Sequence, residues 1–267
     1  RPPTWLRIDQ DLQPVLHDSL LEDGAAWAGE AAPCAYAFSK PGSIKRWLDE
    51  HPKGIEIQDL ASQQVARVCA PSPGQNWWDA CAGSGGKSLH LLDLAEKNLD
   101  LTCTDKRDTA LRNLVKRARA HGLGKLRHYE LDLTSKDLQA PNLPLDGILV
   151  DAPCTGTGTW SRNPDGAWRT EEKDVRQAAR RQLAMLENVS GSVPEGKVLV
   201  YAVCSLTRSE TREVVDTFCS TVPGFELDPF PHPLSGALTD GTVTLLPRDL
   251  QADGMFIARF IRTAPQS

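Results

Sequence analysis

The sequence has no hydrophobic run that approaches the roughly 18 residues needed to cross a membrane, so no membrane protein is expected. Its first residues, RPPTWLRIDQDL, lack the apolar core of a signal peptide. The seven cysteines contain no pair at C-x-x-C spacing, which argues against a disulfide framework or a structural zinc site. We therefore expect a cytoplasmic protein from a reducing compartment, with no metal site.

An excess of positive charge is also missing. The chain has 30 Lys and Arg against 35 Asp and Glu, a net charge of −5, which argues against indiscriminate coating of nucleic acid but allows a local basic face. With 40% hydrophobic and 24% charged residues, the composition excludes intrinsic disorder. A length of 267 residues fits one large α/β domain, with room for a small appendage.

From Gly74 to about Ser220, short apolar runs alternate with helical stretches, which is typical of a parallel sheet. The predicted strands are Gln75–Cys81, Leu99–Asp105, Leu126–Asp132, Asp146–Pro153 and Lys197–Ser205. The first four end in or beside an aspartate: Asp79, Asp105, Asp132 and Asp151. One such aspartate would be explained as a helix N-cap, whereas four favour a ligand site at the carboxyl edge of the sheet. Helices are predicted at Lys106–His121 and Asp174–Val189, and a closing hairpin at Val243–Pro247 and Gly254–Ile261.

A glycine-rich loop, Asp79-Ala-Cys-Ala-Gly-Ser-Gly-Gly-Lys87-Ser88, joins the first strand to a helix. Its small residues let the backbone approach a ligand at the helix N-terminus. Gly86-Lys87-Ser88 ends like the phosphate loop of an NTPase, but Cys81 stands where that motif needs glycine. Asp105 suits the hydroxyls of a ribose and would repel a triphosphate. We favour a nucleoside cofactor such as S-adenosylmethionine, and a P-loop NTPase remains an alternative.

Two cysteines stand at predicted strand ends. Cys154 belongs to Asp151-Ala-Pro-Cys154 after the fourth strand, and Cys204 to Tyr201-Ala-Val-Cys204-Ser205 at the end of the fifth. Both are flanked by Pro, Gly, Ser or Thr rather than by packing residues only. A thiol in such a place is a candidate nucleophile.

With these motifs the chain resembles the Sun/RsmB (NOL/NOP/Sun) family of RNA cytosine-carbon-5 methyltransferases, most of all its bacterial ribosomal RNA members. The matching segments include Gln58–Ser62, Asp79–Ser88, Asp151–Asp165, Cys204-Ser205 and Asp253–Phe256. The resemblance implies a Rossmann-like class I methyltransferase fold, with a seven-stranded, mostly parallel sheet and helices on both faces. It also implies a small N-terminal α+β subdomain of RNA-binding type over residues 1–62 and a catalytic domain over residues 63–267.

The same resemblance implies roles for site residues. Cys204 is expected to attack carbon 6 of cytosine, because carbon 5 alone is too weak a nucleophile to take the methyl group. Cys154 is expected to assist release, and Asp151 to hydrogen-bond the ring at N3. The reverse assignment of the cysteines stays open, since DNA cytosine methyltransferases place their nucleophile in a Pro-Cys motif like Pro153-Cys154. The expected S-adenosylmethionine contacts are Cys81, Ala82, Gly83, Ser84, Gly85, Gly86, Lys87, Asp105 at the ribose, Asp132 at the adenine and Asp151.

The implied partner is RNA, ribosomal RNA rather than transfer RNA, bound by a monomer with no membrane contact. The target base is expected in a loop or an unfolded segment. Residues that could guide the strand are Arg162, Arg169, Lys173, Arg176, Arg180 and Arg181. Arg7 is a further candidate for RNA contact, whereas for Trp5 packing is favoured. The basic helix after Asp105 is interpreted equally well as a solvated face or as an RNA contact.

The chain departs from the family pattern near its motifs. Gly83-Ser84 replaces Ala-Pro in the loop, Val203 replaces the Thr before Cys204, and Thr211-Arg212 replaces Asn-Glu after Glu210. A catalytically weak RNA-binding module on the same fold is therefore a second alternative.

Overall fold

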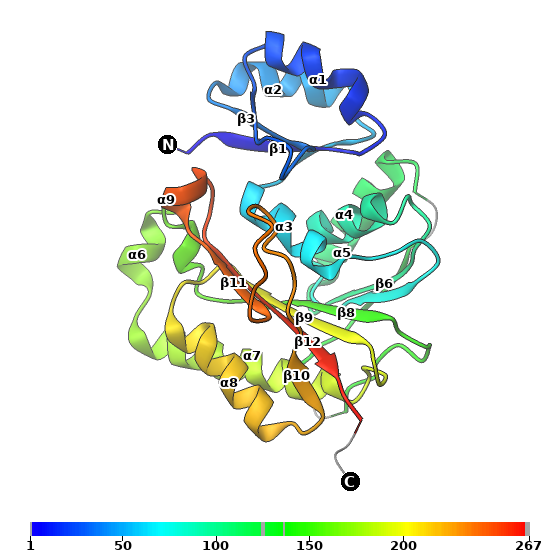
Figure 1. The fold of residues 1–267 in the computed structure, drawn as a ribbon, viewed down its shortest axis with the longest axis vertical. Helices are drawn as coiled ribbons and strands as arrows, with labels where there is room; N and C mark the ends of the chain where they lie inside the picture. The colour runs from blue at the N-terminus through cyan, green and yellow to red at the C-terminus, as the bar shows by residue number, and fades with distance from the viewer. Residues whose placement is uncertain (1, 124–125, 136, 265–267) are drawn as a thin grey trace.

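The computed structural model describes residues 2–123, 126–135 and 137–264, which form two sheets with helices around them (Figure 1). The smaller, antiparallel sheet has the order β2-β3-β1-β4. Its strands are β1 (Thr4–Ile8), β2 (Ala26–Trp27), β3 (Ala35–Phe38) and β4 (Ile55–Ile57), with helices α1 (Gln13–Glu22) and α2 (Pro41–Glu50) over one face. Leu6 and Ile8 pack toward those helices, while Trp5 and Arg7 point to the opposite face because side chains alternate along a strand.

The larger sheet has the order β10-β12-β9-β8-β5-β6-β7, with β11 also paired to β12. The strands are β5 (Asn76–Asp79), β6 (Asp100–Asp105), β7 (Arg127–Glu130), β8 (Gly147–Asp151), β9 (Val198–Val203), β10 (Phe225–Leu227), β11 (Thr242–Leu245) and β12 (Met255–Arg262). Strands β9-β8-β5-β6-β7 run parallel, as predicted, and β12 runs antiparallel to β9. Within the described residues this sheet has eight strands instead of the seven expected, because β10 and β11 pair with opposite halves of β12. The sheet is still seven strands wide.

Helices cover both faces of the larger sheet. On one face lie α3 (Leu60–Cys69), α4 (Gly86–Leu94) and α5 (Asp108–Ala120), and on the other α7 (Glu172–Ser190) and α8 (Arg212–Thr221). Neighbouring Trp77 and Trp78 are both fully buried and point into these two separate cores. Short elements complete the chain: η1 (Thr157–Thr159), α6 (Asp165–Arg169), η2 (Arg208–Glu210) and α9 (Pro247–Leu250). The predicted helices at 106–121 and 174–189 are confirmed as α5 and α7.

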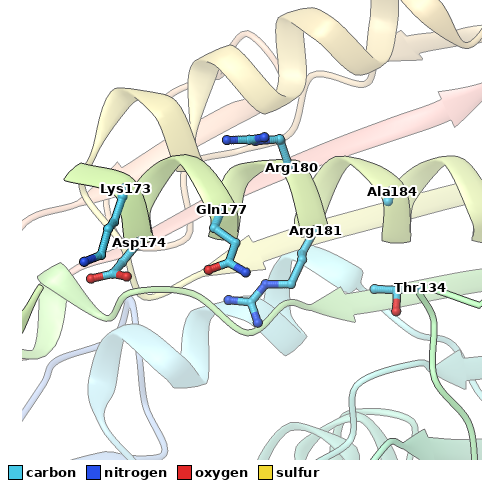
Figure 2. Close-up of a pocket in the computed structure, with 7 residues that line it drawn as sticks. All are labelled: Thr134, Lys173, Asp174, Gln177, Arg180, Arg181 and Ala184. Atoms are coloured by element: carbon cyan, nitrogen blue, oxygen red, sulfur yellow. The ribbon is translucent and has the colours of Figure 1, made fainter. Parts of the chain in front are cut away.

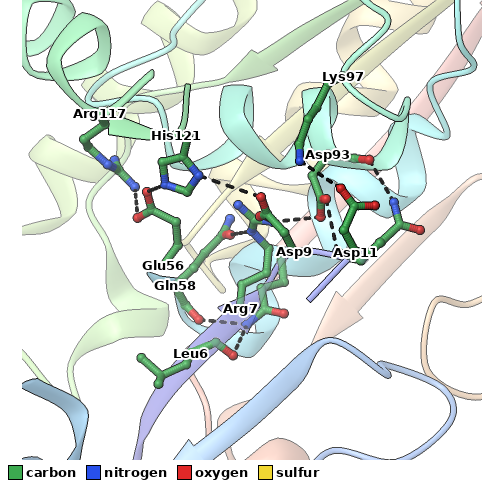
Figure 3. Close-up of polar contacts among 12 residues, drawn as sticks. Leu6, Arg7, Asp9, Asp11, Glu56, Gln58, Asp93, Lys97, Arg117 and His121 are labelled. Atoms are coloured by element: carbon green, nitrogen blue, oxygen red, sulfur yellow. Dashed lines mark hydrogen bonds and ion pairs between the residues drawn. The ribbon is translucent and has the colours of Figure 1, made fainter. Parts of the chain in front are cut away.

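A buried polar network joins the smaller sheet to α4 and α5 (Figure 3). The guanidinium of Arg7 donates to Asp9 at 2.8 Å and to Asp93 at 2.9 Å, and Arg7 is 0% exposed. The expectation that Arg7 contacts RNA is therefore wrong. Trp5 is buried and its indole donates to the Gln251 carbonyl, so its packing role is confirmed. Position 62 lies inside α3, and the division of the chain there stays a prediction.

None of the helices within the described ranges combines the length and the apolar character that crossing a membrane requires.

Candidate active site

The glycine-rich loop turns tightly between β5 and α4. Gly83 and Gly85 have φ values of 54° and 89°, a region that glycine adopts at little cost. The Gly83 N–H donates to the Asp105 carboxylate at 2.9 Å, which fastens the loop to the end of β6. A Cβ on Gly85 would lie 2.8 Å from Leu114 of α5, so glycine also permits the close approach of that helix. The loop backbone is thereby held at the carboxyl edge of the sheet.

Asp79 lies beneath this loop at the end of β5 and is 1% exposed. One carboxylate oxygen accepts a hydrogen bond from Ser88 at 2.6 Å, while Oδ1 has no partner among the described residues. Burial raises the pKa of Asp79 to about 7. An unpartnered, buried oxygen beside a ligand loop is a position where a bound donor group would stabilise the carboxylate.

The two outer aspartates are each covered by a neighbouring cation. The Asp105 carboxylate accepts a hydrogen bond from the Arg107 guanidinium at 3.1 Å. Asp132, two residues beyond β7, accepts one from the Lys106 ammonium at 2.6 Å. Hydrogen bonds from Lys106 and Thr134 lower the pKa of Asp132 to about 2. The Arg107 and Lys106 side chains are 70% and 71% exposed. Exposed pairs contribute about 1 kcal/mol or less, so a ligand can displace these cations at little cost.

Lys87 and Asp151 form an ion pair across the crevice. The Lys87 ammonium lies 2.6 Å from the Asp151 carboxylate, and the two side chains are 13% and 29% exposed. Burial lowers the pKa of Lys87, but the adjacent Asp151 charge raises it by more than burial lowers it. The net shift is upward, so Lys87 stays protonated. The pair places a fixed positive charge next to the strand ends that carry the cysteines.

Cys154 and Cys204 come together as the adjacent strands β8 and β9 predict. Their sulfur atoms lie 3.4 Å apart, and both residues are only partly buried. The hydrogen bond with Cys154 lowers the pKa of Cys204. Burial and the Asp151 charge act in the opposite direction, but the Lys87 charge adds to the lowering, and the net shift is downward. The same hydrogen bond, with burial, raises the pKa of Cys154, and so does the nearby Glu210 carboxylate. The thiolate is thus favoured on Cys204, with the proton held by Cys154.

One site residue was not assigned a role from the sequence. Glu210 is 0% exposed, and its carboxylate accepts hydrogen bonds from residues of both cysteine loops. The only signal in the sequence was that Glu210 survives from a family motif whose next two residues differ.

Four of the six predicted RNA-guiding residues separate into two groups, while Arg169 and Arg176 are exposed and Arg176 pairs with Glu172. Arg162 donates to Asp253 and Asp59 at 3.1 and 2.9 Å and to the Pro3 carbonyl, so it joins three segments of the chain instead of facing solvent. An open groove lies along α7 (Figure 2), lined by Thr134, Lys173, Asp174, Gln177, Arg180, Arg181 and Ala184. None of the expected cofactor contacts lines this groove, whereas three of the expected RNA-guiding residues do.

The parallel sheet order, the glycine-rich loop and the acidic strand ends together define a Rossmann-like methyltransferase fold. The chain belongs to the RsmB/F family of 16S rRNA methyltransferases, because the model of that family matches residues 66–261. It is 32% identical to a probable ribosomal RNA small subunit methyltransferase B from Bacillus subtilis, over 96% of this chain and 59% of that protein. Across the curated relatives it matches, the chain spans between about half and 60% of their length.

Two solved structures show the same fold. The crystal structure of PH0851 has a TM-score of 0.86 and 25% identity, over 98% of this chain and 60% of that one. NSun6 from Pyrococcus horikoshii, solved with SFG, has a TM-score of 0.80 and 18% identity, over 98% of this chain and 91% of that one. The predicted family and fold class are therefore confirmed.

Membership of a methyltransferase family supports S-adenosylmethionine as the cofactor, and the P-loop NTPase alternative is rejected. The donor set fits this molecule. The carboxylates of Asp79, Asp105 and Asp151 suit ribose hydroxyls and a cationic ligand, and the loop N–H groups suit its carboxylate.

Proposed function

We propose that the chain is an S-adenosylmethionine-dependent RNA cytosine-5 methyltransferase that modifies ribosomal RNA in the cytoplasm and works as a monomer. The observation that carries this proposal is the 3.4 Å separation of the Cys154 and Cys204 sulfur atoms at the ends of adjacent parallel strands. Cytosine-5 methylation uses one thiol to add to the ring and a second group to help release it. The names of the curated relatives favour ribosomal RNA as the substrate.

The cofactor would lie over the glycine-rich loop. Residues Cys81 to Lys87 would surround it, with Asp105 at the ribose, Asp132 at the adenine and Asp151 toward the reacting end. When bound, S-adenosylmethionine supplies an electrophilic methyl group from its sulfonium sulfur. The exposed side chains of Arg107 and Lys106 would move off their carboxylates as the cofactor enters.

Cys204 then acts as the nucleophile. Its thiolate adds to carbon 6 of cytosine while a proton passes from the Lys87–Asp151 pair to N3, which leaves a neutral adduct with an electron-rich carbon 5. After carbon 5 has taken the methyl group, its proton passes to water as the net proton released by the reaction, and the sulfur–carbon bond breaks. The thiolate is restored, and N3 returns its proton to the pair. Cys154, in contact with the departing sulfur, assists this release.

A path for the RNA is suggested by the elements that follow the Cys154 loop. Trp168 in α6 is 90% exposed, an unusual state for this residue type. Gly166 in the same helix faces the Trp160 ring, so Trp168, two residues later, points away from the protein. An exposed tryptophan is suited to stacking on an unpaired base, and the exposed Arg180 and Arg181 on α7 are suited to binding phosphates.

The proposal is tested by incubating the purified chain with ribosomal or transfer RNA and methyl-labelled S-adenosylmethionine, followed by bisulfite mapping. Label at carbon 5 of a ribosomal cytosine supports the proposal, and label in transfer RNA alone would change the substrate. Binding of RNA without any incorporation would favour the weak RNA-binding module, to which the departures at Val203, Thr211 and Arg212 point. Calorimetric titration with S-adenosylmethionine, with ATP as the control ligand, tests the cofactor separately.

A further inference from the structure

The loops that carry the two cysteines are tied together by one buried side chain. We propose that Glu210 is a positioning residue for the thiol pair: its carboxylate holds the residue after Cys154 and the residue after Cys204 at the same time. The catalytic meaning of this inference rests on the proposed function, while the geometry that it explains does not.

The hydrogen bonds to Glu210 come from both loops. The Thr155 N–H donates to Glu210 Oε1 at 2.9 Å, and the Thr155 hydroxyl donates to Oε2. The Ser205 hydroxyl donates to Oε2 at 2.7 Å. Thr155 and Ser205 each directly follow a cysteine, so both sulfur atoms are one residue away from a donor to this carboxylate.

Glu210 is itself held firmly. Gln182 of α7 donates to Glu210 Oε1 at 3.0 Å and to the Pro153 carbonyl at 3.1 Å. The Tyr201 hydroxyl contacts Gln182 Oε1 at 3.0 Å and donates to the Glu210 carbonyl at 2.7 Å. Gln182, Tyr201, Ser205 and Glu210 are all 0% exposed. Burying a carboxylate is costly, and packing alone would be served better by an apolar side chain.

The consequence concerns both the distance and the proton of the thiol pair. With both loops tied to one carboxylate, the sulfur atoms stay in contact at 3.4 Å. The negative charge of Glu210 is also among the causes that raise the pKa of Cys154. It therefore helps to keep the proton on Cys154.

The test compares Glu210→Gln with Glu213→Gln, a matched change at an exposed glutamate that pairs with Arg208. The amide nitrogen of glutamine cannot accept a hydrogen bond, so the bonds accepted by one of the two carboxylate oxygens are lost. The geometry is measured without RNA, by the affinity for phenylarsine oxide, which bridges two neighbouring thiols with release of water. We expect Glu210→Gln to weaken this bridging by about tenfold or more, as the loss of a buried hydrogen bond to a charged group implies. Glu213→Gln should match the wild type.

Four further measurements separate positioning from a merely structural role. Because Glu210→Gln loses a buried hydrogen bond, its Tm should fall by several degrees, but S-adenosylmethionine affinity should stay near the wild-type value. In the folded variant, kcat for methyl transfer should fall while KM for RNA is unchanged. Without the Glu210 charge the pKa of Cys154 should fall. Alkylation of Cys154 should therefore begin at a lower pH in Glu210→Gln than in the wild type. Where Glu210→Gln does not fold, Ser205→Ala and Thr155→Val each remove one hydroxyl tie and should each weaken bridging by a smaller factor.

Wild-type arsenical affinity in a folded Glu210→Gln variant would overturn the proposal, as would a loss of bridging that only parallels a loss of stability and cofactor binding. Failure of the proposed function has a different signature. A wild-type chain that binds the arsenical tightly but methylates no RNA would refute the methyltransferase proposal and leave the Glu210 comparison intact.

Discussion

The polar network at the junction of the two sheets and the polar site at the carboxyl edge are both buried, but their charges are balanced differently. At the junction, the carboxylates of Asp9, Glu56 and Asp93 meet the cations Arg7, Arg117 and His121 (Figure 3). At the site, the buried ammonium of Lys87 faces the carboxylates Asp79 and Asp151 and the Cys204 thiol. A balanced network joins segments, whereas a site with excess negative charge suits a cationic sulfonium ligand.

The substitution with the largest expected effect removes a side chain of the site and leaves the junction network unchanged. Cys204→Ala should lower methyl transfer by on the order of 10⁴-fold or more and form no covalent RNA adduct, because the nucleophile is lost. Cys154→Ala should accumulate the adduct, because release is slowed. Denaturing gels with labelled RNA measure both outcomes. The opposite pattern would make Cys154 the nucleophile, and Cys219→Ala serves as the control because it changes a partly buried cysteine on α8.

The substitution with the next largest effect removes a side chain of the junction network and leaves the site unchanged. Arg7→Met should lower the free energy of unfolding by about 3–5 kcal/mol, because the buried carboxylate of Asp93 would lose its cation and that of Asp9 would keep only His121. Arg46→Met removes an exposed ion pair to Asp23 and should cost about 1 kcal/mol or less. Chemical denaturation measures both values. Equal losses in the two variants would contradict the importance assigned to the buried network.

Much of the fold followed from local pattern. The apolar run Gly147–Val150 is bounded by Asp146 and Asp151 and forms most of β8 as expected, because a strand buried on both faces has a continuous apolar sequence. Since β8 and β9 were expected to be parallel, the proximity of Cys154 and Cys204 could also be predicted, although they are 50 residues apart. Their chemical roles remain predictions.

What could not be predicted depends on contacts between distant segments. Arg7 alternates with apolar residues in β1, as a solvent-facing side chain does, but α4 covers that face of the sheet and supplies Asp93, 86 residues away. The carboxylate of Glu210 meets donors 28 and 55 residues away on two other elements. No sequence period encodes such contacts. The predicted closing hairpin is confirmed as β11 and β12, whereas the three-residue strand β10, which shares the same edge of β12, was not predicted.

The pH dependence of stability sharpens the comparison. Burial lowers the pKa of His121, but hydrogen bonds to Asp9 and Glu56 raise it more, to about 9 from an ordinary 6.5. Its contribution to stability should be fully present below about pH 6.5 and be lost as the pH rises through about 9. The expected change in the free energy of unfolding is about 3 kcal/mol. The same contacts with His121 lower the pKa values of Asp9 and Glu56, so these shifts are not added as a separate contribution.

This dependence is measured as the difference in unfolding free energy between the wild type and His121→Gln at pH 6 and pH 9.5. The difference should shrink at the higher pH. His128→Gln changes an exposed histidine and should give the same difference at both values. Parallel wild-type and His121→Gln curves would show that His121 is not charged in the folded protein.

The smallest effect concerns the cations that cover the outer aspartates. Arg107→Ala should change the calorimetric Kd for S-adenosylmethionine by about fivefold or less, since this side chain is 70% exposed and its pair with Asp105 is screened by water. Asp105→Ala should weaken binding by more than about tenfold, because that carboxylate also holds the Gly83 N–H and thereby the loop. Asp105→Asn keeps an acceptor for Gly83 and should fall between the two. If Arg107→Ala were the more damaging change, the cation would be part of the cofactor site, and the negative charge that distinguishes the site from the junction would be smaller than inferred.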